Sequence, residues 1–298
     1  MQEAGGTTFR TTIGNFRFLI SASTAFSGCR LRPAQEGSVS QNFEIIQLEI
    51  DEAPLRALDN RRRNQLVGCM HAHNELAILN RVLMYSMSRT GEGELHDSAQ
   101  SVQMWCFLQV LAGKLLETWG MLTDRFLKAS PRDTALTRLS PEHKASLEWL
   151  EEYFGLGVAK DNSLRIIRDK TAFHYDKLGV DEALNNLAMR ENYVYLAEHP
   201  ANCLYYVGSM LIFRTVFAMI ADRAKDTSRL THDERTKIGT AIATSEAAQV
   251  NFHMHLLLYG LISGGLEGAL GKPLSTLEQV PSRCLALLIR IRSPYRRS

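Results

Sequence analysis

The sequence predicts an all-α protein, an up-and-down helical bundle with additional helices at its C-terminal end. Apolar residues recur every three or four positions through several long segments, which is the period of an amphipathic helix. Residues that start and stop helices, such as the pair Ser140-Pro141 and Gly155, separate these segments. A single short stretch, residues 192–196, is typical of a β-strand, so helices should dominate the fold.

Length and composition are those of a globular chain without a dominant charge. The 298 residues are enough for one large domain or two small ones, and 45% of them are hydrophobic. The net charge of +2 is too small to make the whole surface bind nucleic acid, so RNA binding would need a local basic site. The five cysteines contain no CxxC pair, which argues against a disulfide framework or zinc ribbon and favours a cytoplasmic location.

Residues 1–42 are predicted to form a poorly ordered N-terminal arm. They are rich in Gly, Ser, Thr and Arg and show no sustained period. Within the arm, residues 17–29 loosely resemble a bacterial lipoprotein signal that ends at Cys29, which leaves membrane attachment as an alternative. The apolar run is short and interrupted by Ser and Thr, so a disordered leader is the favoured interpretation.

The next two segments are predicted to form an antiparallel helical hairpin. Apolar residues lie mostly at helical spacing from 54 to 88, and Gly91 and Gly93 then end the pattern. The second helix carries the clearest apolar stripe of the chain and ends before Ser130-Pro131. This stripe consists of Leu108, Leu111, Leu115, Trp119, Leu122 and Phe126. Two helices joined by a glycine-containing turn are expected to pack side by side.

Two shorter helices are predicted to follow the hairpin. Ser140 is a good N-cap and Pro141 suits the first helical position, so one helix should run to about Phe154. The next helix is capped by Asn162 or Ser163 and ends no later than Gly179. Its shared face consists of Leu164, Ile167 and Thr171.

The C-terminal part is predicted to contain a short helix and two long ones. The short helix covers about 181–189, and a strongly apolar helix covers 201–223. Arg214 lies in the middle of the apolar helix, where a charge opposes membrane insertion, so a buried bundle helix is favoured and no membrane contact is expected. The last helix should run from 232 to about 262, followed by Ser263-Gly264-Gly265, and residues 226–298 form an extension with a basic tail.

The strongest candidate for chemistry is the pair Arg168 and His174. Arginine presents a permanently charged fork that fits a phosphate, whereas histidine titrates near neutral pH and can give or take a proton. Together they suit RNA cleavage by the RNA's own 2′-hydroxyl, without a metal. Arg168 would stabilise the pentacoordinate phosphate and His174 would act as acid or base. Asp169, Lys170 and Tyr175 are the expected substrate contacts.

The spacing of this pair sets a geometric condition. Six residues of an ideal α-helix turn the side-chain direction by about 240° net, so Arg168 and His174 would not share a face. They would converge where the helix ends or bends near Phe173, or where a second copy supplies the motif across a two-fold axis. The alternative is structural: Arg168 pairs with a nearby carboxylate and His174 terminates a helix.

The run from Ile167 to Asp176 resembles the RxxxxxH form of the Rx4-6H motif of HEPN domains. This superfamily of all-α bundles includes many metal-independent ribonucleases and phage-defence or toxin proteins. The resemblance covers about 43–225, where a long helical hairpin precedes the motif. The residue after the arginine is often Asn in that family, and Asp169 departs from the pattern by adding a negative charge.

The resemblance implies a metal-independent endoribonuclease that leaves a 2′,3′-cyclic phosphate and needs no cofactor. It also implies a homodimer, because HEPN nucleases place both motifs in one cleft, and a role in phage defence or a toxin–antitoxin system with an inhibitory protein partner. The alternative function, motivated by Asp169, is a non-catalytic helical module that binds a nucleotide, RNA or a protein.

Other residues that suggest chemistry have simpler explanations. The pairs His71 with His73 and His253 with His255 point apart on a helix, so neither pair can chelate a metal. His232-Asp233 fits a helix N-terminus. Three further groups are expected to serve packing or solvation. These are the tryptophans Trp105, Trp119 and Trp149, the triplet Arg61-Arg62-Arg63, and the cysteines Cys69 and Cys106.

Overall fold

The computed structural model describes residues 47–48, 50, 52–86, 93–128, 134–155, 161–172, 179–187, 191–224, 226–274 and 279–280. Regular structure in these ranges is almost entirely helical, which confirms the all-α prediction. The exceptions are an antiparallel pair of two-residue strands, β1 (Gln47–Leu48) and β2 (Gln279–Val280), and one bridge between Tyr195 and Leu204. The predicted arm at 1–42 and the basic end of the tail lie outside the described residues.

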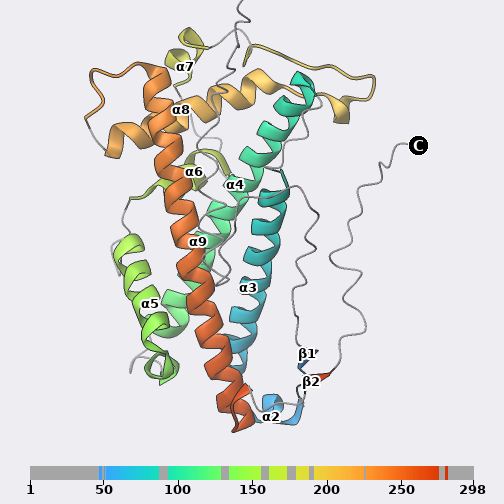
Figure 1. Cartoon of the computed structure of the whole chain (residues 1–298), viewed down its shortest axis with the longest axis vertical. Helices are drawn as coiled ribbons and strands as arrows, with labels where there is room; N and C mark the ends of the chain where they lie inside the picture. The colour runs from blue at the N-terminus through green and yellow to red at the C-terminus, as the bar shows by residue number, and fades with distance from the viewer. Residues whose placement is uncertain are drawn as a thin grey trace, which may run out of the picture.

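Eight α-helices and several short turns carry the described fold (Figure 1). The α-helices are α2 (Glu52–Ala57), α3 (Asn60–Ser86), α4 (Glu94–Leu122), α5 (Pro141–Phe154), α6 (Ser163–Ile167), α7 (Asp181–Asn185), α8 (Tyr206–Ala224) and α9 (His232–Leu270). Two π-helical turns, η2 (Thr123–Leu127) and η4 (Arg168–Ala172), directly follow α4 and α6, and the 3-10 turn η3 (Thr134–Arg138) precedes α5.

The predicted antiparallel hairpin is α3 packed against α4. Near the start of α3, the Gln65 Nε2 donates to the backbone oxygen of Arg125, 2.8 Å away, just beyond the end of α4. Farther along, the Lys114 Nζ lies 3.2 Å from the Glu75 Oε1. From Gln65 to Glu75 the chain advances along α3, while the partner moves back from Arg125 to Lys114, which fixes the antiparallel direction that Figure 1 shows.

The helix predicted over 54–88 is in fact two helices. The Asp59 carboxylate accepts a hydrogen bond from the backbone N–H of Arg62 at 2.8 Å. An aspartate that satisfies a free backbone N–H in this way starts a new helix, so α2 ends at Ala57 and α3 begins at Asn60. The apolar spacing continues across the break, which is why periodicity alone does not detect it.

A single hydrophobic core joins α3, α4, α5, α6, α8 and α9. Phe154 at the end of α5 and Phe217 on α8 are among the largest fully buried side chains, together with Leu115 on α4 and Met254 on α9. The predicted stripe of the second hairpin helix is buried along its whole length, from Leu108 to Phe126. Helix α9 therefore belongs to the same core as the hairpin.

Helix α8 departs from the up-and-down arrangement. Figure 1 shows it lying across α9 near the upper end of the molecule. The crossing is close because position 239 has no side chain: a Cβ added to Gly239 would lie 1.7 Å from the backbone oxygen of Phe217. Among the described residues, no helix combines the length and the apolar character needed to span a membrane, α8 included.

Helix α9 is longer than its sequence predicts. It continues through Gly264 and Gly265 to Leu270 and ends at Gly271, which adopts a left-handed φ of 66°. At this point α9 packs closely against α3: a Cβ on Gly265 would lie only 3.0 Å from the Leu66 Cδ1. Gly265, which was expected to help stop the helix, instead lets Leu66 of α3 approach it.

The predictions for the other elements are confirmed in part. Helix α5 begins and ends as predicted: Ser140 accepts from the His143 N–H, and Gly155 follows the last turn with a φ of 79°. The predicted helix over 181–189 ends at Asn185, and the predicted one over 201–223 begins only at Tyr206. In the β-prone stretch 192–196, only Tyr195 forms a bridge.

Candidate functional site

The helix that carries Arg168 starts from fixed contacts. Asn162 caps α6 as predicted, since its Oδ1 accepts the N–H of Arg165 at 2.9 Å. Glu246 of α9 accepts two further bonds, from the Ser163 N–H at 3.2 Å and from the Tyr153 hydroxyl at 2.6 Å. Burial and the Glu246 carboxylate raise the pKa of Tyr153, which keeps the hydroxyl protonated and donating. The start of α6 is therefore tied to α5 and α9.

The predicted apolar face of α6 is buried. Leu164 and Ile167 are 0% exposed, Ile166 is 8% exposed, and all three belong to the core shared by α4 and α9. One turn later, the Thr171 hydroxyl is also buried and donates to the backbone oxygen of Ile167 at 2.6 Å. This packing holds the backbone of the motif helix against the bundle.

Arg168 lies where the α-helix changes to a π-helical turn. Helix α6 ends at Ile167, and η4 runs from Arg168 to Ala172. Single π-helical turns are rare and occur often at functional sites. The 240° rotation expected between Arg168 and His174 assumes an ideal α-helix, and this assumption fails over Arg168–Ala172.

The Arg168 guanidinium is bound to the residue next to it. Its Nε and Nη2 both lie 2.6 Å from the Asp169 Oδ1. The two side chains are 33% and 38% exposed, so solvent screens the pair and its contribution to stability is small. Nη1 has no hydrogen-bond partner among the described residues. The carboxylate pairing that formed the structural alternative for Arg168 is therefore present, and it uses the Nε and Nη2 of the guanidinium.

Three of the five predicted site residues are placed, and two are not. Arg168, Asp169 and Lys170 follow one another on η4, and all three are half-buried. His174 and Tyr175 lie outside the described residues. Their positions relative to Arg168 therefore stay a prediction, as does the cleft.

The histidine pairs behave as predicted within each helix, but two histidines of different helices meet. The His73 ring on α3 contacts the His255 ring on α9 edge to face, with centroids 4.8 Å apart. His253 faces elsewhere, stacking on Trp149 at 4.4 Å, and His71 is exposed beside Glu75. Among the described residues, no group of three or more His, Cys, Asp or Glu is placed to hold a metal.

Acidification is expected to destabilise the fold through His255. Burial, reinforced by His73, lowers the pKa of His255 from 6.5 to about 4. The unfolded chain therefore binds more protons between these values, so this stabilisation is complete above pH 6.5 and is lost as the pH falls toward 4. The full difference is roughly 3 kcal/mol. Urea unfolding between pH 7 and pH 4 should show a weaker pH dependence in His255→Gln than in the wild type or in exposed His71→Gln. Equal dependence in all three proteins would contradict this assignment.

An ionic cluster surrounds the buried side chain of Arg214. Its Nη1 lies 2.6 Å from the Glu191 Oε2, and its Nη2 donates to the Asn186 backbone oxygen at 2.8 Å and to the Asp233 carboxylate. The arginine that argued against a membrane span is thus 5% exposed and neutralised inside the bundle. It joins α8 to the start of α9.

His232 begins α9 as predicted for a helix N-terminus. Thr231 and Glu234 form a reciprocal capping box around it. The His232 ring is buried, and burial together with Arg214 lowers its pKa. Neither ring nitrogen has a hydrogen-bond partner among the described residues, which matches a neutral packed ring.

The tryptophans and cysteines mostly serve packing. Trp105 and Trp119 are buried in the core as predicted, whereas Trp149 is half-buried and stacks on His253. Cys69 is 1% exposed, and burial raises the pKa of its thiol to about 12, so it is not a nucleophile. Cys106 was expected in the core, and that prediction is wrong: it lies on the exposed face of α4.

In comparisons with known proteins, the chain matches no family model, no curated protein and no solved structure.

Proposed function

We propose that this protein is a metal-independent endoribonuclease of HEPN type, in which Arg168 binds the scissile phosphate. The observation that carries the proposal is the placement of Arg168. It begins a π-helical turn on a helix whose apolar face is buried, and its guanidinium is one third exposed. A fixed backbone with an accessible guanidinium edge suits a phosphate-binding group. The sequence adds His174 six residues later, a residue type that transfers protons near neutral pH.

The proposed reaction is an intramolecular phosphoryl transfer, in which one P–O bond forms and another breaks. A base removes the proton of the RNA 2′-hydroxyl, and the oxygen attacks the adjacent phosphorus. The P–O5′ bond breaks, and an acid returns a proton to the leaving 5′-oxygen. The products are a 2′,3′-cyclic phosphate and a 5′-hydroxyl. In this scheme His174 exchanges the protons and Arg168 balances the charge on the pentacoordinate phosphorus.

A homodimer is part of the same proposal. One motif supplies a single histidine, whereas the reaction uses both a base and an acid. Two motifs facing each other across a two-fold axis would supply one of each. We further propose a cytoplasmic location, because the cysteine pattern suits a reducing compartment, and a role in phage defence or a toxin–antitoxin system controlled by a protein partner.

A second candidate function is a non-catalytic module that binds RNA, a nucleotide or a protein. The observation that favours it is the bond between Arg168 and Asp169, which places a carboxylate beside the proposed phosphate site. RNA binding that survives His174→Ala, with no cleavage by the wild type, would support this function over the nuclease.

Replacing Asp169 by Asn is expected to strengthen RNA binding. The change removes a negative charge and releases the Nε and Nη2 of Arg168, so the affinity for a short RNA should rise about 3- to 10-fold at low salt. Asp124→Asn on η2 is the matched control, because it changes the net charge equally at an exposed site paired with Lys128. Fluorescence anisotropy measures both variants. A loss of affinity in Asp169→Asn alone would show instead that Asp169 orients Arg168.

A further inference from the structure

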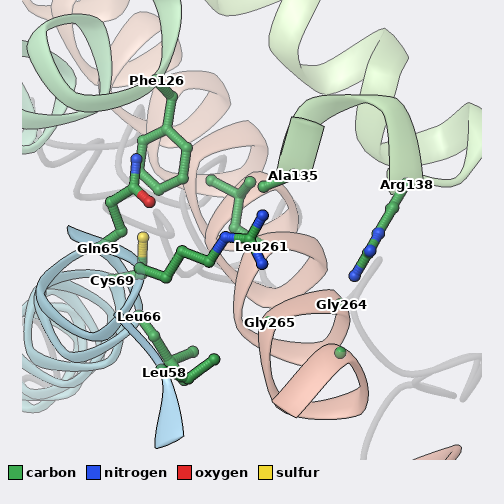
Figure 2. A pocket seen from close by; sticks show the side chains of 12 residues that line it. Leu58, Gln65, Leu66, Cys69, Phe126, Ala135, Arg138, Leu261, Gly264 and Gly265 are labelled. Carbon is green, nitrogen blue, oxygen red and sulfur yellow. The ribbon is translucent and has the colours of Figure 1, made fainter. Parts of the chain in front are cut away.

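A pocket lies between the first turns of α3, the turn η3 and the last turns of α9 (Figure 2). Its volume is about 100 Å³. Typical sites for drug-sized ligands occupy about 300–1,000 Å³, so this pocket fits a much smaller molecule or one end of a larger one. Arg168, Asp169 and Lys170, the described residues of the proposed nuclease site, do not line it.

The buried lining of the pocket is uncharged and, apart from the amide of Gln65, apolar. Leu66, Phe126 and Leu261 are each at most 6% exposed and form most of it. Cys69 completes the floor, and its raised pKa keeps the thiol protonated and neutral. Figure 2 shows Phe126 and Cys69 directed toward the same space from different helices. A floor of this kind favours a compact hydrocarbon group over a bare inorganic ion.

One wall of the pocket is formed by glycines, which have no side chains. Gly264, Gly265 and Gly268 of α9 line the pocket at successive turns. A Cβ on Gly265 would lie 3.0 Å from Leu66, and one on Gly268 would lie 2.6 Å from the Arg138 Nη1. A Cβ on Gly264, in contrast, would meet no atom within 4 Å. Position 264 is therefore where a side chain would enter open space at the pocket.

Two arginines border this apolar space from different elements. Arg138 extends from η3 toward Gly264 in Figure 2, and it has no hydrogen-bond or ion-pair partner among the described residues. Arg62 comes from the first turn of α3. In the part of the chain that the structure describes, the only carboxylate paired with Arg62 is Asp59. It lies 3.5 Å from the Arg62 Nε, and that pair is exposed and weak.

We propose that this pocket binds a small organic anion with a compact apolar body. The body packs on the Leu66–Phe126–Leu261 floor and against the glycine wall, and the acid group lies between Arg62 and Arg138. Guanidinium forks bind carboxylates and phosphates alike, so the shared chemistry is an oxyanion on an apolar group. The proposed site shares no lining residue with Arg168, Asp169 or Lys170 and does not rest on the proposed function.

The test measures binding of three probes to the full chain by NMR or calorimetry. Benzoate and phenyl phosphate carry both halves of the proposed ligand, whereas inorganic phosphate lacks the apolar body. We expect at least one of the first two to bind with a dissociation constant of about 1 mM or lower, and inorganic phosphate to bind at least tenfold more weakly. The stronger of the two organic probes identifies the preferred acid group. Equal affinity for inorganic phosphate, or no binding of either organic probe, would overturn the proposal.

Matched variants locate the binding. Gly264→Met should fill the pocket and abolish binding, whereas Gly120→Met, at another glycine with open space around its Cβ, should not. Arg138→Gln should weaken binding at least tenfold and exposed Arg229→Gln should leave it unchanged. RNA cleavage, measured in parallel, is expected to be the same in all four variants. Binding that persists in both Gly264→Met and Arg138→Gln would place the anion elsewhere and overturn the assignment.

Discussion

Arg168→Ala and His174→Ala are each expected to remove nearly all RNA cleavage while leaving the fold intact. Loss of a group that stabilises the transition-state charge costs about 10²- to 10³-fold, and loss of a general acid or base costs about 10²- to 10⁴-fold. Both effects should appear in kcat, because the interactions strengthen in the transition state. The rates are measured on a fluorogenic RNA under single-turnover conditions.

Two further variants separate chemistry from structure. Arg168→Lys keeps the charge but loses the planar fork, so it should recover only part of the activity. His71→Ala removes a histidine that lies exposed on α3, and it should cleave at the wild-type rate. Circular dichroism and melting curves check that every variant is folded. Cleavage at the wild-type rate by both Arg168→Ala and His174→Ala would contradict the proposed site, even where RNA binding is retained.

Gly239→Ala is expected to cause a severe loss of stability, although it adds only one methyl group. The new Cβ would lie 1.7 Å from the Phe217 backbone oxygen, 2.6 Å from its carbonyl carbon and 3.0 Å from its Cα. A flexible side chain cannot relieve this overlap, because all three atoms belong to the backbone of α8. Helix α8 would have to move away from α9, and Phe217 is fully buried at their contact.

The expected cost exceeds the usual 1–3 kcal/mol of an overpacked core, with a fall in melting temperature of about 10 °C. Gly120→Ala on α4 is the control, since its Cβ would meet no atom within 4 Å. That change should stabilise the protein by about 0.5–1 kcal/mol, because alanine loses less conformational entropy in a helix. A melting temperature for Gly239→Ala equal to that of Gly120→Ala would mean that α8 and α9 do not pack as described.

Local rules predicted the parts of this fold that depend on neighbouring residues. The Ser140 and Asn162 caps, the end of α5 at Gly155 and the buried face of α6 follow from the hydrogen-bonding and side-chain chemistry of a few consecutive residues. The α3–α4 hairpin also follows, because its second helix has one continuous apolar stripe. These features need no knowledge of what packs against them.

The features that sequence reasoning missed depend on contacts between distant segments. Gly265 looks like a helix terminator until Leu66 is placed against it, and the crossing of α8 depends on the approach of Gly239 to Phe217. The same holds at the candidate site. The sequence singled out Arg168 and the extra charge of Asp169, but not the π-helical turn or the bond between their side chains. Neither His-x-His pair indicates in the sequence that the rings of His73 and His255 contact each other between α3 and α9.

The most direct test of the central claim is the chemistry of the cleaved RNA ends. Purified protein is incubated in EDTA with an RNA that contains one preferred cleavage position, and with the same RNA carrying a single 2′-deoxy nucleotide there. The proposed mechanism predicts a 2′,3′-cyclic phosphate and a 5′-hydroxyl from the first RNA, identified by mass spectrometry, and no cleavage at the modified position of the second. Cleavage of the 2′-deoxy substrate at that position, or products with a 5′-phosphate, would contradict it, because neither can arise from attack by the RNA's own 2′-oxygen.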